Sequence, residues 1–231
     1  MIPVLIGLAA LAFALYWLSR LKQKDVGETA AVLGLSVIAS GAESRGTTAE
    51  GFDFHQRVLA RGVVAGVPAE LATRTVRTKA FRRARRTPTQ LTVLTLRPTQ
   101  PVVVALRLQP SGLMRDLESM FHDAPAARPT GDGPFDAAYH LYSGESQKAL
   151  TVLSPELRQA LLGFRATSAV SQPGSTTDYV TSANLLGTFE VSGDSASYYV
   201  YGSPTKKLAE HLKQAAPLLA ALAGLRDGQP H

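Results

Sequence analysis

Histidine, serine and acidic residues most often carry catalysis or bind metals, and this chain spaces them poorly for either task. No two of its five histidines fall within five residues of each other: His55, His122, His140, His211 and His231. Zinc sites draw their ligands from short, repeated spacings. The chain has no cysteine, which excludes thiolate ligands, cysteine nucleophiles and disulfides. We therefore predict no metal site.

Two serine segments resemble parts of hydrolase active sites. "GDSAS" around Ser195 lacks the Gly-Gly that follows the nucleophile of serine proteases, and its Gly-Asp pair is typical of a hairpin turn. Ser203 and Lys206 have the Ser-x-x-Lys spacing, with Ser182-Ala183-Asn184 upstream. Penicilloyl-type enzymes use such elements in the opposite chain order and add a Lys-Thr-Gly strand. We expect Ser203 to be a helix N-cap and Lys206 to face water with Lys207.

Phosphate-binding loops are also missing from the sequence. It contains neither Gly-x-x-x-x-Gly-Lys-Ser/Thr nor Gly-x-Gly-x-x-Gly. We predict no cofactor and a protein without catalytic residues. A hydrolase-like enzyme at a membrane surface is the open alternative, and it would need a pocket that joins His140, Asp178 and a serine.

The strongest local feature is a basic run between residues 74 and 86, with seven Lys or Arg in thirteen positions and no acid. These seven cations exceed the net charge of +6, so the charge of the chain is concentrated in one patch. The candidate contacts for an anionic surface are Arg74, Arg77, Lys79, Arg82, Arg83, Arg85 and Arg86.

Three roles fit this run. A solvated connection on the surface is the commonest one. Contact with anionic lipid headgroups, or with a membrane protein partner, comes second, because cations beside an anionic leaflet are attracted to it. Nucleic acid is the least favoured, since Phe81 is the one aromatic residue in the run and no recognition motif surrounds it.

The N-terminal stretch is typical of a membrane anchor. Residues 1–18 include no charge and would span about 27 Å as a helix, close to the core of a thin bilayer. Tyr16 and Trp17 end this stretch, and three cations follow: Arg20, Lys22 and Lys24. We predict a transmembrane helix over residues 1–19 that binds the lipid bilayer.

The charge asymmetry around this helix predicts its orientation. By the positive-inside rule, the N-terminus lies outside the cell (inner) membrane and the following domain is cytoplasmic. A secretory signal would instead carry its charge before the apolar stretch and a cleavage site after it. Ala12-Phe13-Ala14 resembles such a cleavage site, which keeps an exported protein as the alternative. Its position inside the apolar stretch favours the uncleaved anchor.

The basic run must be positioned by strands, because the pattern after residue 52 is rich in Val, Leu and Thr. Four such runs, bounded by Gly and Pro, predict a four-stranded antiparallel meander at residues 55–68, 69–78, 89–98 and 101–110. Gly66-Val67-Pro68 indicates the first turn. The basic run then lies at the end of the second strand and in the connection to the third.

The C-terminal half alternates helices and strands. We predict a helix at 111–123 capped by Ser111, a strand at 135–143, and a helix capped by Ser154. A hairpin turns at Gly193-Asp194. The last helix starts at Ser203 and should be kinked or split at its proline, Pro217. Its apolar stripe predicts core packing through Leu208, Leu212, Ala215, Leu219 and Leu222.

These elements give an α+β fold: an N-terminal transmembrane helix, an antiparallel β-meander, then mixed strands and helices with a C-terminal helix. The apolar part of residues 30–39 is too short to cross a bilayer and fits a helix or a strand. The expected parts are an anchor at 1–19, a juxtamembrane segment and linker at 20–51, a strand-rich subdomain at 52–123, a linker at 124–134 and an α+β subdomain at 135–231.

Two segments, "FDAAYHLYSGESQKALTVLSPELRQALL" and "FEVSGDSASYYVYG", carry a family resemblance. Together with the anchor, residues 135–222 resemble bacterial membrane-anchored proteins that contain domains of unknown function. The resemblance implies an architecture and a membrane location, and it implies no catalytic residue. We therefore expect a single-pass membrane protein that acts as a non-enzymatic interaction or accessory module.

Overall fold

The computed structural model describes residues 24–39, 41–47, 53–77, 89–111, 127–169 and 187–225. Its strands are β1 (Leu35–Val37), β2 (Glu43–Thr47), β3 (Asp53–Val64), β4 (Val67–Arg77), β5 (Thr89–Leu96), β6 (Leu106–Pro110), β7 (Tyr139–Tyr142), β8 (Thr188–Ser192) and β9 (Ser195–Tyr201). Its helices are residues 24–32, α3 (Gly133–Ala138), α4 (Ser146–Val152), α5 (Pro155–Ala169) and α7 (Lys206–Leu222).

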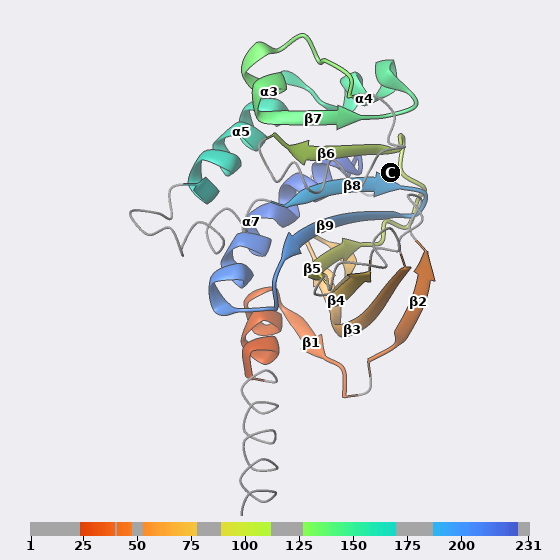
Figure 1. Cartoon of the computed structure of the whole chain (residues 1–231), viewed down its shortest axis with the longest axis vertical. Helices are drawn as coiled ribbons and strands as arrows, with labels where there is room; N and C mark the ends of the chain where they lie inside the picture. The colour runs from red at the N-terminus through yellow and green to blue at the C-terminus, as the bar shows by residue number, and fades with distance from the viewer. Residues whose placement is uncertain are drawn as a thin grey trace, which may run out of the picture.

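One antiparallel sheet of nine strands organises the molecule (Figure 1). The order is β1-β3-β4-β5-β9-β8-β6-β7, and β2 also pairs with β3. Because β9 and β8 lie between β5 and β6, the segments 52–123 and 135–231 contribute neighbouring strands to the same sheet. The expected α+β class is confirmed.

The predicted meander is correct for three strands and wrong for the fourth. β3, β4 and β5 are consecutive neighbours, and their first turn lies at Ala65-Gly66, which both have positive φ, of 51° and 75°. β6 does not follow β5, because β9 pairs along β5 instead. β9 suits this central position in the sheet, because its inward side chains, Ala196, Tyr198 and Val200, are fully buried.

The helices α5 and α7 pack on one face of this sheet and bury the main core. The apolar stripe of α7 is buried as predicted. α7 runs without a break through Pro217, which corrects the expected split. Pro217 is exposed, and the carbonyl it leaves without a helical partner belongs to Lys213, also exposed, so water can replace that hydrogen bond.

The helix caps and one strand differ in part from the prediction. Ser154 caps α5, where its Oγ accepts a hydrogen bond from the Leu157 N–H at 3.3 Å. Ser203 is not a cap: Thr205 has the extended backbone of an N-cap, and its Oγ1 accepts from the Leu208 N–H at 3.2 Å. Part of the expected strand 135–143 is the helix α3, because Asp132 caps that helix.

The expected linker 124–134 is attached to the sheet where the structure describes it. The Arg128 N–H donates to the Leu141 carbonyl at 2.7 Å. The Asp136 carboxylate accepts from the Thr130 N–H and hydroxyl, both at 2.8 Å. The helix predicted at 111–123 lies outside the described residues apart from Ser111.

Residues 24–47 are an integral part of the fold. The helix at 24–32 ends in a turn at Gly34 (φ 70°), and β1 and β2 follow, so residues 30–39 form both a helix end and a strand. Ala30 and Leu33 are buried in the core. The predicted anchor at 1–19 lies outside the described residues. Among the helices of the described ranges, none has the length and hydropathy needed to cross a membrane.

Candidate functional site

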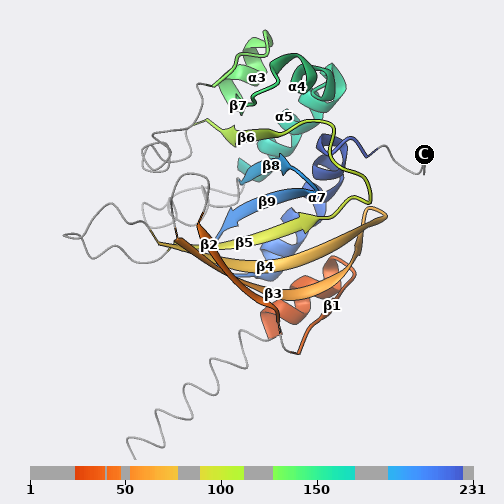
Figure 2. The same ribbon diagram turned by 90° about the vertical axis from the view of Figure 1, so that its right-hand side faces the viewer.

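The basic run begins inside a strand. Arg74 and Arg77 belong to β4, and Arg77 is its last residue. Lys79, Arg82, Arg83, Arg85 and Arg86 lie outside the described residues. Figure 2 looks onto the face of the sheet that α5 and α7 leave uncovered, which we call the helix-free face. Arg74 lies on this face, because Leu71, three positions earlier in the same strand, faces the core. Its side chain is half-buried, so this cation does not extend from a solvated loop.

Two aromatic rings enclose the Arg74 guanidinium. Its central carbon lies 4.6 Å from the ring centroid of Phe54 on β3 and 4.9 Å from that of Tyr199 on β9. A cation over an aromatic face is attracted by the ring quadrupole. Gly46 on β2 makes room for Phe54, because a Cβ there would lie 2.9 Å from the ring. Gly46, Phe54, Arg74 and Tyr199 form a set that we call the Arg74 stack.

Hydrogen bonds fix the orientation of the same guanidinium. The Arg74 Nε donates to Gln56 Oε1 at 2.8 Å, and Gln56 is the residue opposite Arg74 in the β3–β4 register. The Arg74 Nη1 donates to the Tyr199 hydroxyl at 3.4 Å. These bonds use two of the five N–H donors of the arginine. The remaining N–H groups can donate to two oxygens of an oxyanion in one plane.

Arg74 differs from other arginines of this face in its charge partners. Other arginines on the helix-free face have carboxylate partners: Arg61 and Arg97 lie 2.9 Å and 3.3 Å from the Glu70 oxygens. Arg107 lies 3.6 Å from Glu190. Among the described residues, no carboxylate lies within ion-pair distance of Arg74. The difference distinguishes Arg74 from these three paired arginines.

The protonation state of Tyr199 decides whether its hydroxyl can accept a hydrogen bond from Arg74. Burial raises the pKa of its hydroxyl above the ordinary value, the Glu190 charge raises it further, and the Arg74 charge lowers it. Tyr199 is therefore neutral at physiological pH and can accept the hydrogen bond from Arg74. Glu190 also forms a side-chain hydrogen bond with Tyr199, so the nearest described carboxylate is separated from the Arg74 guanidinium by this hydroxyl.

The residues that could do chemistry are not brought together. His55 lies 3.3 Å from Glu43 on the exposed β2–β3 pair, His140 is on β7, and His211 is buried on α7. Ser195 follows a hairpin turn at Gly193-Asp194, as predicted. Within the described ranges, no three His, Asp or Glu side chains come together to hold a metal ion. His122, Asp178 and His231 lie outside these ranges.

Sequence reasoning missed one buried polar pair. The Tyr198 hydroxyl lies 2.8 Å from His211 Nε2 and accepts from the Gly187 N–H, also at 2.8 Å. Phe164 stacks on the His211 ring at a centroid distance of 4.7 Å. Two features of the sequence could have predicted this pair: Tyr198 occupies an inward position of its strand, and His211 lies beside the apolar stripe of α7. Because both groups are buried and hydrogen-bonded, the pair fits the core of the domain.

Comparisons with known proteins add little to this geometry. No protein-family model matches the chain, and no curated protein matches it. Among solved structures, the chain is similar to the crystal structure of the mycobacterial trehalose monomycolate transport factor A, TtfA. The identity is 13%, the match covers 91% of this chain and 97% of that one, and the TM-score is 0.46. A likeness at this level decides neither family nor function.

Proposed function

We propose that this protein is a single-pass membrane-anchored interaction module without catalytic activity, and that it binds an anionic group of its partner at the Arg74 stack. The apolar residues 1–18 and the cations that follow them support the anchor and a cytoplasmic domain. Among the described residues, no nucleophile lies in contact with both a base and a group that orients the base. This favours a binding function over a hydrolytic one.

The observation that carries the proposal is the Arg74 guanidinium, which has no carboxylate within ion-pair distance among the described residues. A cation that is held between two rings by directed hydrogen bonds has lost much of its rotamer freedom before a ligand arrives. Binding an oxyanion there costs less ordering than binding to a solvated arginine. The cations of the run from Arg77 onward follow directly in the sequence and would add long-range attraction.

Binding of anions tests this surface. The full chain, held in nanodiscs of neutral lipid, is titrated with anionic vesicles, an acidic peptide and single-stranded DNA at low and high salt. We expect Arg74→Gln to weaken binding to the preferred probe by at least several-fold. The matched control is Arg61→Gln, which removes an arginine of the same face that is already paired with Glu70. Equal losses in the two variants would contradict the assignment to Arg74.

The probes also separate the three roles of the basic run. Tightest binding to single-stranded DNA would favour the nucleic-acid alternative, and its salt dependence would count the phosphate contacts. Tightest binding to the acidic peptide would favour a protein partner. Indifference to all three anions would leave the run as a solvated connection and would overturn the binding proposal.

Membrane topology tests the other half of the proposal. A cytoplasm-active fluorescent reporter at His231 should be bright, and a periplasm-active phosphatase at the same position should be inactive. The protein should stay with the membrane after carbonate extraction. The reverse reporter pattern, or loss of the first twenty residues from the mature protein, would favour the exported alternative.

A further inference from the structure

The turn between β9 and α7 joins two distant parts of the chain. On one side, the Thr29 hydroxyl of the helix 24–32 donates to the Thr205 carbonyl at 3.3 Å. On the other side, the Gly202 N–H donates to the Gln90 carbonyl at 2.9 Å, and the Thr92 hydroxyl donates to the Gly202 carbonyl at 2.8 Å. The turn therefore links the N-terminal helix to the start of β5.

This link places the helix 24–32, the turn 202–205 and the start of β5 at one end of the domain. The helix 24–32 continues the chain from the apolar stretch, while β5 begins at Thr89, directly after the run. In Figures 1 and 2 the start of α7 lies beside the helix 24–32, and α3 and α4 lie at the opposite end. Residues 24, 77, 89 and 202–207 define what we call the anchor-side surface.

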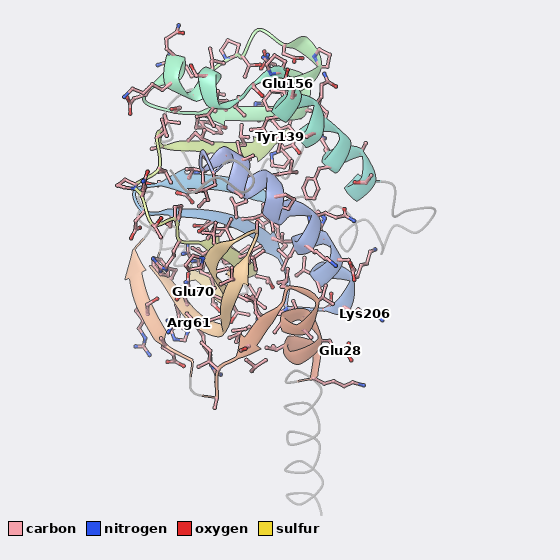
Figure 3. The ribbon with its side chains drawn as sticks, turned by 180° about the vertical axis from the view of Figure 1, so that it is seen from behind. Glu28, Arg61, Glu70, Tyr139, Glu156 and Lys206 are labelled. Atoms are coloured by element: carbon pink, nitrogen blue, oxygen red, sulfur yellow. The ribbon has the colours of Figure 1, made fainter. Side chains whose placement is uncertain are left out.

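Two lysines add charge to this surface. Lys206 and Lys207 are exposed in the first turn of α7, which contains no acidic residue. Cations at a helix N-terminus oppose the helix dipole, so the stability of α7 does not explain their position. Figure 3 shows Lys206 at the same end of the molecule as Glu28 of the helix 24–32.

Lys24 adds a third exposed cation, which is partly balanced because Glu28 lies 3.9 Å away. Asp25 is a second acidic neighbour on the same helix. The two lysines of α7 therefore carry the larger share of the charge among the described residues.

We propose that the anchor-side surface rests on anionic lipid headgroups of the leaflet that holds the anchor, with Lys206 and Lys207 as contacts. The proposal rests on the membrane anchor proposed above and adds an orientation to it. Because Ala30 of the helix 24–32 and Leu33 directly after it are buried in the core, the anchor is joined to the domain by a docked helix. The sheet then stands with β7, α3 and α4 away from the membrane.

The absence of cysteine makes the orientation measurable with single labels on the full chain. A cysteine at Ser203, which is exposed in the turn, reports on the anchor-side surface, and a cysteine at Gln147 on α4 reports on the far end. Each labelled protein is reconstituted in vesicles that carry a headgroup-attached quencher, with either neutral or anionic lipid. We expect strong quenching at residue 203 only, several-fold greater with anionic lipid and reduced at high salt.

Charge variants test the contacts themselves. Lys206→Gln with Lys207→Gln should abolish most of the lipid-dependent quenching at residue 203. The matched control, Lys148→Gln with Lys213→Gln, removes the same charge from exposed positions outside the anchor-side surface and should leave the quenching unchanged. Equal quenching at residues 203 and 147, or equal effects of the two double variants, would overturn the proposed orientation.

Carbonate extraction of the same vesicles separates this inference from the proposed function. Protein that stays in the membrane but shows no difference between the two labels retains its anchor and refutes only the orientation. Protein that is extracted refutes the anchor, and the orientation is refuted with it.

Discussion

Tyr198 and Tyr199 are neighbours on β9 and lie on opposite faces of the sheet, in contrasting surroundings. Tyr198 faces α7, where its hydroxyl meets His211 and the Gly187 N–H inside the core. Tyr199 faces away from the helices, where it forms one side of the Arg74 stack. Both hydroxyls are neutral at physiological pH, because burial raises both pKa values above the ordinary range.

The difference between the two faces lies in how polar groups are satisfied. On the core face, each polar atom named above has a hydrogen-bond partner within the domain, and these hydrogen bonds stabilise the fold. On the helix-free face, Arg74 keeps donors and a charge that the described residues do not match. Aromatic rings occur on both faces, so the cation without a direct carboxylate partner among the described residues distinguishes the candidate site.

The largest effect should come from the core face. Leu212→Ala should lower the free energy of unfolding by about 2–5 kcal/mol, because the side chain is fully buried and its loss leaves a cavity. Urea denaturation of the full chain measures this. Gln214→Ala, at an exposed position of the same helix, is the control and should change the value by about 0.5 kcal/mol or less. A small loss at Leu212 would mean that α7 is a detachable helix.

Alkaline pH should weaken the core next. Burial raises the pKa of Tyr139 to about 12, while the Arg165 charge lowers it in part. Since the folded value exceeds the ordinary one, the stability is complete below pH 10 and is lost as pH rises toward 12. The two-unit shift corresponds to about 2–3 kcal/mol. Tyr139→Phe should flatten the pH dependence of unfolding in that window, and an unchanged slope would contradict this assignment.

A matched pair of substitutions compares the two faces directly. Tyr198→Phe should cost about 1–3 kcal/mol, because it leaves the Gly187 N–H and His211 buried without this partner. Tyr199→Phe keeps the ring over Arg74 but removes the 3.4 Å hydrogen bond and the hydrogen bonds to Ser197 and Glu190. It should cost about 1 kcal/mol or less, because Arg74 and Glu190 are only partly buried and water can replace the lost partner. Thermal unfolding of both variants under the same conditions measures the two losses of stability. Equal costs would mean that the helix-free face is as structural as the core.

The smallest effect on stability should come from Arg74 itself. A double-mutant cycle between Arg74→Gln and Tyr199→Leu should give a coupling of about 0.5–1 kcal/mol, the lower part of the cation–π range, because the Arg74 side chain is only half-buried. The cycle between Arg61→Gln and Glu70→Gln provides a paired reference on the same face. A coupling of several kcal/mol for Arg74 would make the stack a structural tie and weaken its role in binding.

Local patterns predicted the elements that depend on near neighbours. The β8–β9 hairpin, the Ser154 cap and the buried stripe of α7 follow from turn residues, capping chemistry and helical spacing. The short helix α3 was missed because its apolar residues fit either structure, and the Asp132 cap decided between them. Thr205 replaced Ser203 as the cap of α7 because the turn before it is held by Gln90 and Thr92.

Long-range pairing could not be predicted from the same patterns. Nothing in β5 shows whether its free edge will meet β6 or β9, because both candidates are short and apolar. The Arg74 stack depends on that choice, since Tyr199 reaches Arg74 only after β9 has paired with β5. The basic run was therefore visible in the sequence, while the aromatic partners of its first residue were not.

The pairing of β5 with β9 also has a consequence for synthesis. Leu96 pairs with Ala196, so β5 leaves the ribosome about a hundred residues before its neighbour exists. During that interval the nascent chain presents an unpaired apolar strand edge, which is prone to wrong pairing with other chains. Translation that pauses before residue 195 would prolong this exposure. Chaperone dependence should therefore rise with slow translation of the last third of the chain.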